Sequence, residues 1–170
     1  MKILDVGCGA AKQQGAIGID YKPSAGVDII HNLNRYPWPI EDDRFDLILC
    51  RDIVEHLEDI VSLMEEMHRI AKPGGRIKIW TPHFAHFNSY RDPTHKYHFS
   101  HGTFDYFTGG VDYPIYSQKK FKMISKQFIF RKKMCLGKLI AALHSVWYEK
   151  YYCHLDPPHG LYFELEVVKN

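Results

Sequence analysis

The feature that most constrains the fold is a series of short apolar runs, each closed by a glycine or a polar residue. The runs span residues 2–6, 16–20, 27–31, 45–50 and 76–80. Runs of this length are typical of strands buried on both faces of a parallel sheet. Between the last two runs, residues 60–71 repeat apolar side chains at helical spacing, and Pro73 and Gly74 end the pattern. Strands that alternate with crossovers predict an α/β fold with a mostly parallel sheet.

The chain changes in character after residue 80. Residues 81–118 are rich in histidine and aromatic residues and too irregular for one long helix, so we expect a loop region that holds the substrate. Beyond it, the hydropathy pattern predicts a strand over 121–131, a helix over 138–152 and a last strand over 161–169. A chain of 170 residues without a linker or an internal repeat predicts a single domain, residues 1–170.

Two glycines follow the first predicted strand, and two carboxylates close neighbouring strands. Gly7 and Gly9 allow a turn with positive φ and let backbone N–H groups approach a ligand closely. Asp5 and Asp20 end the first two strands, which is the layout of a nucleoside site. A dinucleotide-binding turn would have a third glycine at position 12, where this chain has Lys12, so NAD is the weaker prediction.

Four motifs in order resemble the class I S-adenosylmethionine-dependent methyltransferases. They are LDVGCG at 4–9, GID at 18–20, FDLILCRDIVEHL at 45–57 and IAKPGGRIKIW at 70–80. Later stretches, among them DPTHKYHFS at 92–100 and LYFELEVVK at 161–169, are similar to small bacterial and archaeal members of the methyltransferase type-11 group. The resemblance implies a Rossmann-like fold, with a mostly parallel seven-stranded sheet whose last strand is antiparallel.

The same resemblance implies S-adenosylmethionine as the cofactor. It places the glycine turn against the methionine half, the acid after the second strand on the ribose hydroxyls, and the residues after the third strand on the adenine. The residues so assigned are Asp5, Gly7, Cys8, Gly9, Asp20, Tyr21, Asn32, Leu33, Arg51 and Asp52. A carboxylate suits a ribose because it accepts charge-assisted bonds from two adjacent hydroxyls. Asp52 could instead cap a helix, and Glu55 and His56 could be no more than that helix's surface.

Histidines after the fifth predicted strand are candidates for chemistry. A hydroxyl or protonated amine acceptor must lose a proton, and histidine suits that task near neutral pH, whereas a carboxylate acceptor needs no base. We predict His83 and His95 as base or substrate-orienting residues, with hydrogen-bonded packing beside aromatic rings as the alternative. The spacing of His95, His98 and His101 would suit a metal on a helix, but Asp92-Pro93 favours a turn, and we predict no metal site.

The first two crossovers are too short for helices. Only residues 7–15 and 21–26 connect the first three predicted strands, whereas a parallel crossover generally needs a dozen residues or more. Helices are therefore reduced on one face of the sheet, and apolar strands on that face require a cover. The helix predicted over 138–152 could fold back onto it, or a second copy of the chain could pack there, and we predict a homodimer.

These observations favour an enzyme that transfers a methyl group to a small-molecule or lipid-linked acceptor, at oxygen rather than nitrogen. The alternative from another class is a non-catalytic or regulatory partner subunit of a larger methyltransferase. A nucleic-acid methyltransferase is a further alternative because Lys and Arg gather in residues 119–133, but no RNA-binding module accompanies them, and we expect no nucleic-acid partner. The absence of an apolar stretch of about 18 residues predicts no membrane insertion and a cytoplasmic protein.

Overall fold

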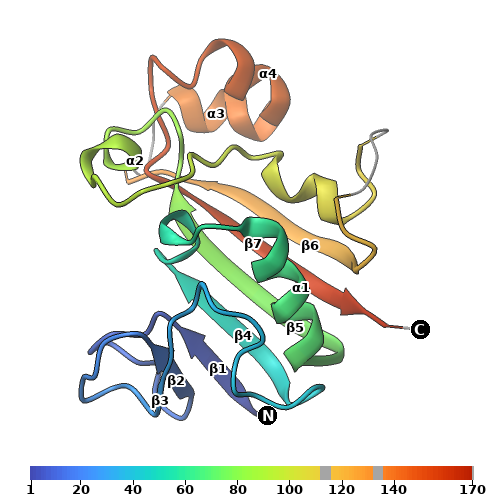
Figure 1. The fold of residues 1–170 in the computed structure, drawn as a ribbon. Coiled ribbons are helices and arrows are strands. Elements are labelled where there is room, and N and C mark those ends of the chain that lie inside the picture. The colour runs from blue at the N-terminus through green and yellow to red at the C-terminus, as the bar shows by residue number, and fades with distance from the viewer. Residues whose placement is uncertain (112–115, 132–135, 170) are drawn as a thin grey trace.

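The computed structural model describes residues 1–111, 116–131 and 136–169, whose strands form one seven-stranded sheet (Figure 1). Its strand order is β3-β2-β1-β4-β5-β7-β6. Strands β1 to β5 run parallel, and β7 is antiparallel to both of its neighbours, β5 and β6. The strands are β1 Ile3–Val6, β2 Ile17–Asp20, β3 Ile29–Ile30, β4 Phe45–Arg51, β5 Ala71–Pro82, β6 Lys120–Ile129 and β7 Gly160–Val168. The predicted mostly parallel seven-stranded sheet is confirmed.

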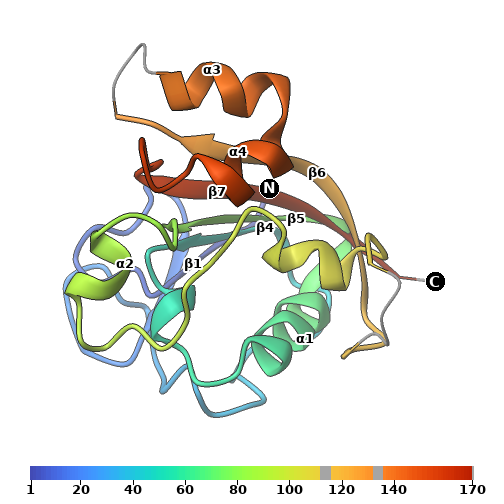
Figure 2. The same ribbon diagram turned by 90° about the horizontal axis from the view of Figure 1, so that it is seen from above.

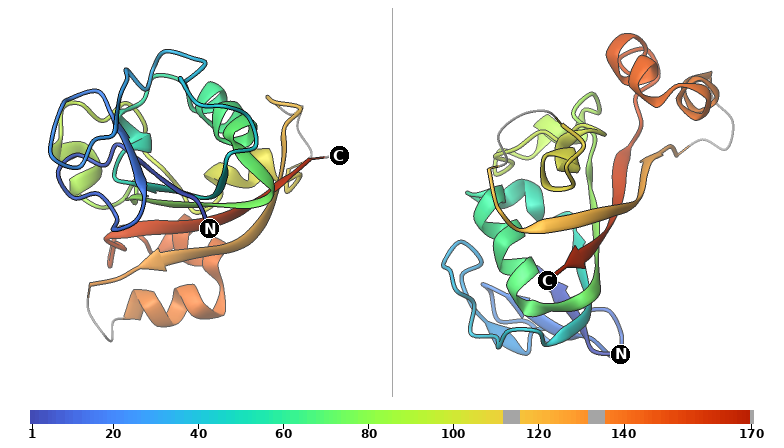
Figure 3. Two further views of the ribbon diagram at one scale, coloured as in Figure 1. Left: turned by 90° about the horizontal axis from the view of Figure 1, so that it is seen from below. Right: turned by 90° about the vertical axis from the view of Figure 1, so that its right-hand side faces the viewer.

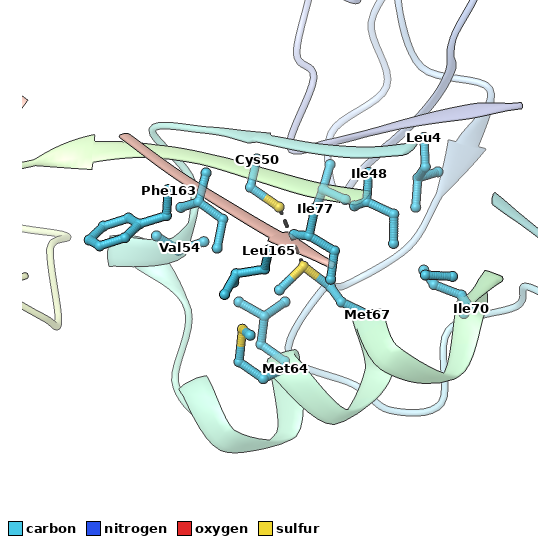
Figure 4. Packing of buried hydrophobic residues seen from close by; sticks show 14 of the residues in the cluster. Leu4, Ile48, Cys50, Val54, Met64, Met67, Ile70, Ile77, Phe163 and Leu165 are labelled. Carbon is cyan, nitrogen blue, oxygen red and sulfur yellow. Dashed lines mark hydrogen bonds between the residues drawn. The ribbon is translucent and has the colours of Figure 1, made fainter. Parts of the chain in front are cut away.

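The main core lies between the sheet and the helix α1, Ile60–Ile70 (Figure 4). Asp59 begins this helix by accepting hydrogen bonds from the N–H groups of Val61 and Ser62, at 2.9 and 3.1 Å. The apolar face of α1 then packs on the side chains that alternate strand residues present to it, and Cys50 Sγ lies 3.6 Å from Met67 Sδ. Burial of the apolar face of α1 explains why the helix forms where the sequence predicts it.

The opposite face of the sheet is only partly covered (Figure 2). The helices α3, Leu136–Leu143, and α4, Ser145–Tyr151, lie on that side near β6 and β7, away from β1, β2 and β3. The connections between β1, β2 and β3 contain no helix, as predicted. On the uncovered side Arg76 forms ion pairs with Glu164 and Glu166, at 3.5 and 3.1 Å. The charged side chains on this part of the face can be hydrated, so this part does not require a helix to cover it.

The predicted helix over 138–152 is two helices, and it does not fold back over the first strands (Figure 3). The break falls at His144, whose φ of −154° and ψ of 85° are not helical. Leu139, Leu143 and Trp147 are 60, 76 and 57% exposed, so the apolar side chains expected to cover the sheet largely face outward. Of the two alternatives for covering the first strands, the one that uses this helix is wrong, because α4 anchors at the end of β6, through Tyr148 against Phe128.

The histidine-rich region is more ordered than a loop. It contains the short helix α2, Asn88–Arg91, and a 3₁₀ turn at Thr103–Phe107. Another 3₁₀ turn, Val54–His56, lies outside this region and follows β4. Phe99 and Phe104 are buried, and the ring of Phe104 lies 4.8 Å from that of Phe163 on β7. Residues 112–115 of this region, and residues 132–133 of the basic segment, lie outside the described residues. Within the described residues, every helix is too short or too polar to span a bilayer.

Candidate functional site

Two cavities lie at the carboxyl ends of the parallel strands, where the strand order reverses between β1 and β4. The first has a volume of about 580 Å³ and is lined by residues that follow β2, β3 and β4, among them Tyr21, Asn32 and Leu33. The second, of about 660 Å³, lies toward β5 and the histidine-rich region. Asp52 and His56 line both cavities, so the two spaces meet at these side chains.

The glycine turn after β1 needs glycine for two different reasons. Gly7 has a φ of 64°, and a Cβ there would lie 2.4 Å from Cγ1 of Ile53, so packing against Ile53 excludes any side chain. Gly9 has a φ of 49°, but within 4 Å of its Cβ position there is no atom of the described residues other than its chain neighbours. The space over Gly9 is therefore open to a ligand, whereas Gly7 serves the fold.

The cysteine between these glycines points away from the cavities. Cys8 is 6% exposed, and its Sγ donates to the carbonyl of Gly26 at 3.5 Å. Burial raises the pKa of this thiol. Because the side chain is buried, only the backbone of Cys8 could contact a ligand bound at the glycine turn.

The acids that end β1 and β2 hold the glycine turn in place. Asp5 is 1% exposed, and its Oδ2 accepts from Gln13 N at 2.7 Å and from Arg51 Nη2. Its Oδ1 is buried and has no hydrogen-bond partner among the described residues. Asp20 Oδ2 accepts from Gly9 N at 3.0 Å, and Oδ1 accepts from Lys22 N at 3.1 Å. Predicted cofactor residues thus organise the turn before any ligand binds.

Asp52 is not a helix cap. Its φ of 50° is in the left-handed region, and its N–H donates to the carbonyl of Trp80 at 2.9 Å. The 3₁₀ turn that follows has Ile53 at its N-cap position without a side-chain capping bond. Burial raises the pKa of Asp52, while the nearby His159 and His56 act in the opposite direction. The alternative interpretation of Asp52 as a cap is therefore wrong, and its carboxylate lines the meeting point of the cavities.

Glu55 and His56 are parts of the second cavity's wall rather than helix surface. Glu55 is 1% exposed, accepts a hydrogen bond from Thr81 Oγ1 at 3.1 Å, and has a pKa that burial raises to about 7. Burial lowers the pKa of His56, and the neighbouring His95 lowers it further. Their position directly after β4, at the carboxyl edge of the sheet, was the available sequence signal.

The two histidines predicted for chemistry have different surroundings. His83 is fully buried, with Nδ1 accepting from Ala85 N at 3.1 Å and Nε2 lying 3.0 Å from Glu149 Oε1, and it lines neither cavity. His95 lines the second cavity, and its Nδ1 lies 2.9 Å from the carbonyl of Ser89. The structure therefore brings His95, but not His83, to the second cavity.

The predicted histidine trio does not share a face. His98 stacks on Tyr90, with ring centroids 3.9 Å apart, and His101 stacks on Phe128 at 4.5 Å. His95 instead meets His56, with ring centroids 4.6 Å apart. The sequence also missed His159, which lines the second cavity from the segment before β7 and carried no motif that would have singled it out.

Comparison with known proteins finds similarity to methyltransferases in the first half of the chain. Residues 4–79 match a family model described as a methyltransferase domain. A crystal structure of an S-adenosylmethionine-dependent methyltransferase from Mesorhizobium loti superposes with a TM-score of 0.62, covering 97% of this chain and 90% of that one at 16% identity. At this identity the likeness shows a shared fold. Residues 4–79, less than half of the chain, are thus similar to the methyltransferase family, and the shared fold extends over nearly the whole chain.

Two curated methyltransferases are similar over a shorter stretch. Tocopherol O-methyltransferase of Arabidopsis thaliana is 33% identical over an alignment of 103 residues, gaps included, and the match covers 47% of this chain and 30% of that protein. A ubiquinone biosynthesis O-methyltransferase of Pseudomonas aeruginosa (strain LESB58) is 30% identical over an alignment of 101 residues, gaps included, and the match covers 47% of this chain and 44% of that protein. The chain thus spans less than half the length of these relatives.

The match to the family model ends inside β5 of this chain, and the second cavity extends beyond the matched residues. Asp52, Glu55 and His56 lie within the matched residues, whereas His95 and His159 lie after them. The first cavity, in contrast, is lined almost wholly by matched residues, with Thr94 the exception. The methyltransferase signature therefore accounts for one cavity and part of the other.

Proposed function

We propose that the protein transfers the methyl group of S-adenosylmethionine to an oxygen atom of a small-molecule or lipid-linked acceptor. The observation that carries this proposal is the meeting of two cavities at Asp52 and His56, on the carboxyl edge of a methyltransferase-type sheet. A nucleoside in one cavity and an acceptor in the other would bring their reacting atoms together there. Such alignment is the main contribution that a protein makes to a reaction between two bound reactants.

Two sets of residues fit this cofactor: those that line the first cavity, and those at the ends of β1, β2 and β4 that do not line it, among them Asp5 and Asp20. Asp20 accepts one backbone N–H on each carboxylate oxygen, and each oxygen retains a lone pair that could accept from a ribose hydroxyl. Leu33, Ile53 and Leu57 supply apolar surface for a purine. The open space over Gly9 and the unpartnered Oδ1 of Asp5 suit the polar methionine half. We propose that Arg51, whose guanidinium pairs with Asp5, contributes to that end of the site.

The second cavity fits an acceptor that carries an ionisable oxygen. The sulfonium of the cofactor supplies an activated methyl group, so the residues here need only orient the acceptor, take up its proton and exclude water. His95 and Asp52 face this space, together with apolar surface from Trp80 and Ile129. Both curated relatives are named as O-methyltransferases, which supports oxygen as the methylated atom. His83 has a supporting role in this proposal, because it binds Glu149 beneath the histidine-rich region.

We also propose that two copies of the chain associate in the cytoplasm. Leu136, Leu143 and Val146 are each at least 70% exposed on α3 and α4, and a second copy would bury them. Free thiols at Cys8, Cys50 and Cys153 are consistent with a reducing compartment. Sedimentation at micromolar concentration would contradict the dimer by giving the mass of one chain.

Calorimetry with S-adenosylmethionine and S-adenosylhomocysteine tests the proposed function. Asp20→Asn keeps the shape of the side chain but removes its charge, so we expect cofactor affinity to fall by about tenfold or more, the effect of losing one charge-assisted bond of about 1.5–3 kcal/mol. Glu41→Gln, at an acid whose side chain is 84% exposed and remote from both cavities, should bind as the parent does.

Two results would contradict the proposal in different ways. Unchanged affinity in Asp20→Asn would refute the assignment of the ribose. If the parent protein bound neither compound, the role of a non-catalytic partner subunit would remain. Incubation with methyl-labelled cofactor and cell extract, followed by identification of the labelled compound, would then name the acceptor.

A further inference from the structure

Three side chains converge in the wall of the second cavity, and one of them, His56, also lines the first cavity. The carboxylate of Glu55 and the imidazoles of His56 and His95 each offer a ligand atom, and these atoms all lie within 4.8 Å of one another. Glu55 and His56 belong to the turn after β4, whereas His95 comes from the histidine-rich region, so tertiary contact alone assembles the set. We propose that these three residues bind one divalent transition-metal ion, for which zinc is the test ion.

The hydrogen bonds around the two imidazoles leave one nitrogen of each available to a metal. His95 Nδ1 lies 2.9 Å from the carbonyl of Ser89, and because a carbonyl only accepts, Nδ1 carries the proton and Nε2 has the lone pair. Thr94 Oγ1 donates its single proton to Asp92 Oδ1 at 2.7 Å. The same hydroxyl lies 2.8 Å from His56 Nδ1, so it must accept the proton of that nitrogen.

This pattern leaves the neutral His56 with a lone pair on Nε2 as well. Both imidazoles are therefore held in the tautomer that binds a metal through Nε2. Orientation of a ligating histidine by a hydrogen bond at its other nitrogen is the usual outer-shell arrangement in metal sites.

The third ligand provides an independent observation. Glu55 is 1% exposed, and its Oε2 accepts from Thr81 Oγ1. Its Oε1 is buried and has no hydrogen-bond partner among the residues that the structure describes. A buried carboxylate oxygen without a partner is costly, and a cation beside it removes that cost. A metal ion bound to Oε1 would therefore supply the interaction that this oxygen lacks.

The ligand types select the class of metal. Two imidazoles and one carboxylate suit zinc and other divalent first-row metals, whereas calcium and magnesium prefer oxygen ligands throughout. Two atoms bound about 2.1 Å from one zinc ion lie at most about 4.2 Å apart, so small rotations of the partly exposed imidazoles bring the three atoms within range. Three protein ligands leave a coordination position open, and the second cavity, which all three residues line, adjoins it.

A metal here would deepen the proposed function, on which this step rests. An acceptor hydroxyl bound to the ion would lose its proton to cavity water more readily, because the ion stabilises the oxyanion. The oxygen would then form a bond to the methyl carbon of S-adenosylmethionine while the carbon–sulfur bond breaks. The bonding pair returns to sulfur, which leaves neutral S-adenosylhomocysteine, the methylated acceptor and one released proton. His95 would in this case act on the acceptor as a metal ligand.

Zinc titration of the tag-free, full-length protein tests the site. We expect the parent to bind about one zinc per chain after chelator treatment, with a cobalt-substituted form that shows visible d–d absorption. His95→Ala and Glu55→Gln should each lose the bound zinc and that absorption. His98→Ala removes an exposed histidine from the same segment and should retain both. Circular dichroism of each variant separates loss of the metal from loss of the fold.

The outcomes distinguish this inference from the proposed function. Failure of the folded parent to bind zinc, or zinc binding by folded His95→Ala equal to that of the parent, would overturn the metal site. Cofactor binding is measured on the same samples, and because His95 does not line the first cavity, His95→Ala should keep its affinity for S-adenosylmethionine within about twofold of the parent. Zinc binding without cofactor binding would leave the metal site standing and refute the methyltransferase activity.

Discussion

The part of the chain that matches the methyltransferase family and the part beyond residue 79 position their polar groups by different means. In the matched part, Asp5, Asp20 and Arg51 lie in the last two residues of three neighbouring strands, so backbone pairing sets their places. In the later part, His95 and His159 lie on irregular segments that side-chain packing and local hydrogen bonds hold. The proposed cofactor side is therefore built from the sheet, whereas the proposed acceptor side depends on how loops pack against the sheet.

The largest effect should come from Tyr148, which anchors α3 and α4. Its side chain is fully buried, its hydroxyl donates to the carbonyl of Asp156 at 2.6 Å, and its ring lies 5.1 Å from that of Phe128. Tyr148→Ala should cost about 3–5 kcal/mol locally, as for other buried aromatic side chains. Hydrogen exchange should then speed up in α3 and α4 while β1 and β4 stay protected.

The matched control for this variant is Trp147→Ala, at a neighbouring side chain that is 57% exposed and should change little. If Tyr148→Ala removed protection from β1 and β4 to the same extent as from α3 and α4, the two parts would unfold as one unit. The contrast between them would then not extend to stability.

A smaller effect should separate the two glycines of the turn after β1. Both have positive φ, so Gly7→Ala and Gly9→Ala share a backbone cost of about 1–2 kcal/mol. Only at Gly7 would the new methyl group collide with Ile53, which adds about 1–3 kcal/mol of overpacking. In urea, Gly7→Ala should therefore have a lower free energy of unfolding than Gly9→Ala. Relative to the stability that each variant loses, Gly9→Ala should lose more affinity for the cofactor. Equal stability of the two variants would contradict the assignment of Gly7 to packing.

The smallest effect is a pH dependence that comes from the later part of the chain. Burial lowers the pKa of His101 in the folded protein, whereas the unfolded chain protonates it at its ordinary value near 6.5. The unfolded state then binds more protons, so the stability is complete above about pH 6.5 and decreases as the pH falls below it, by at most about 1.4 kcal/mol per pH unit for one histidine. His101→Gln does not titrate, and its free energy of unfolding should fall less between pH 7.5 and about 5.5. Equal slopes for parent and variant would remove His101 from this dependence.

The strands could be predicted because their signals are local. Short apolar runs closed by Gly7, Asp20 or Arg51 place β1, β2 and β4 within a residue or so of where they form. β3 shortens to Ile29–Ile30 because it is the edge strand with a single neighbour, and β5 begins early at Ala71, where it already pairs with Phe45. These differences come from strand pairing, which no single run contains.

The site divides in the same way. The resemblance to methyltransferases predicted Tyr21, Asn32, Leu33 and Asp52, which follow strands, as cofactor residues, and the structure brings them to one cavity. His83 was predicted from an equally suitable place after β5, but it turns inward to Glu149 on α4, a contact between residues 66 positions apart.

The sequence alone determined the order of the strands along the chain, the turns that end them and the edge of the sheet where a nucleoside would bind, because these depend on residues within a few positions of one another. Only the tertiary structure decided that Glu55, His56 and His95 converge, that His83 is buried and that α3 and α4 leave the first strands uncovered. Side-chain direction in the loops depends on long-range packing, and a local pattern cannot specify it.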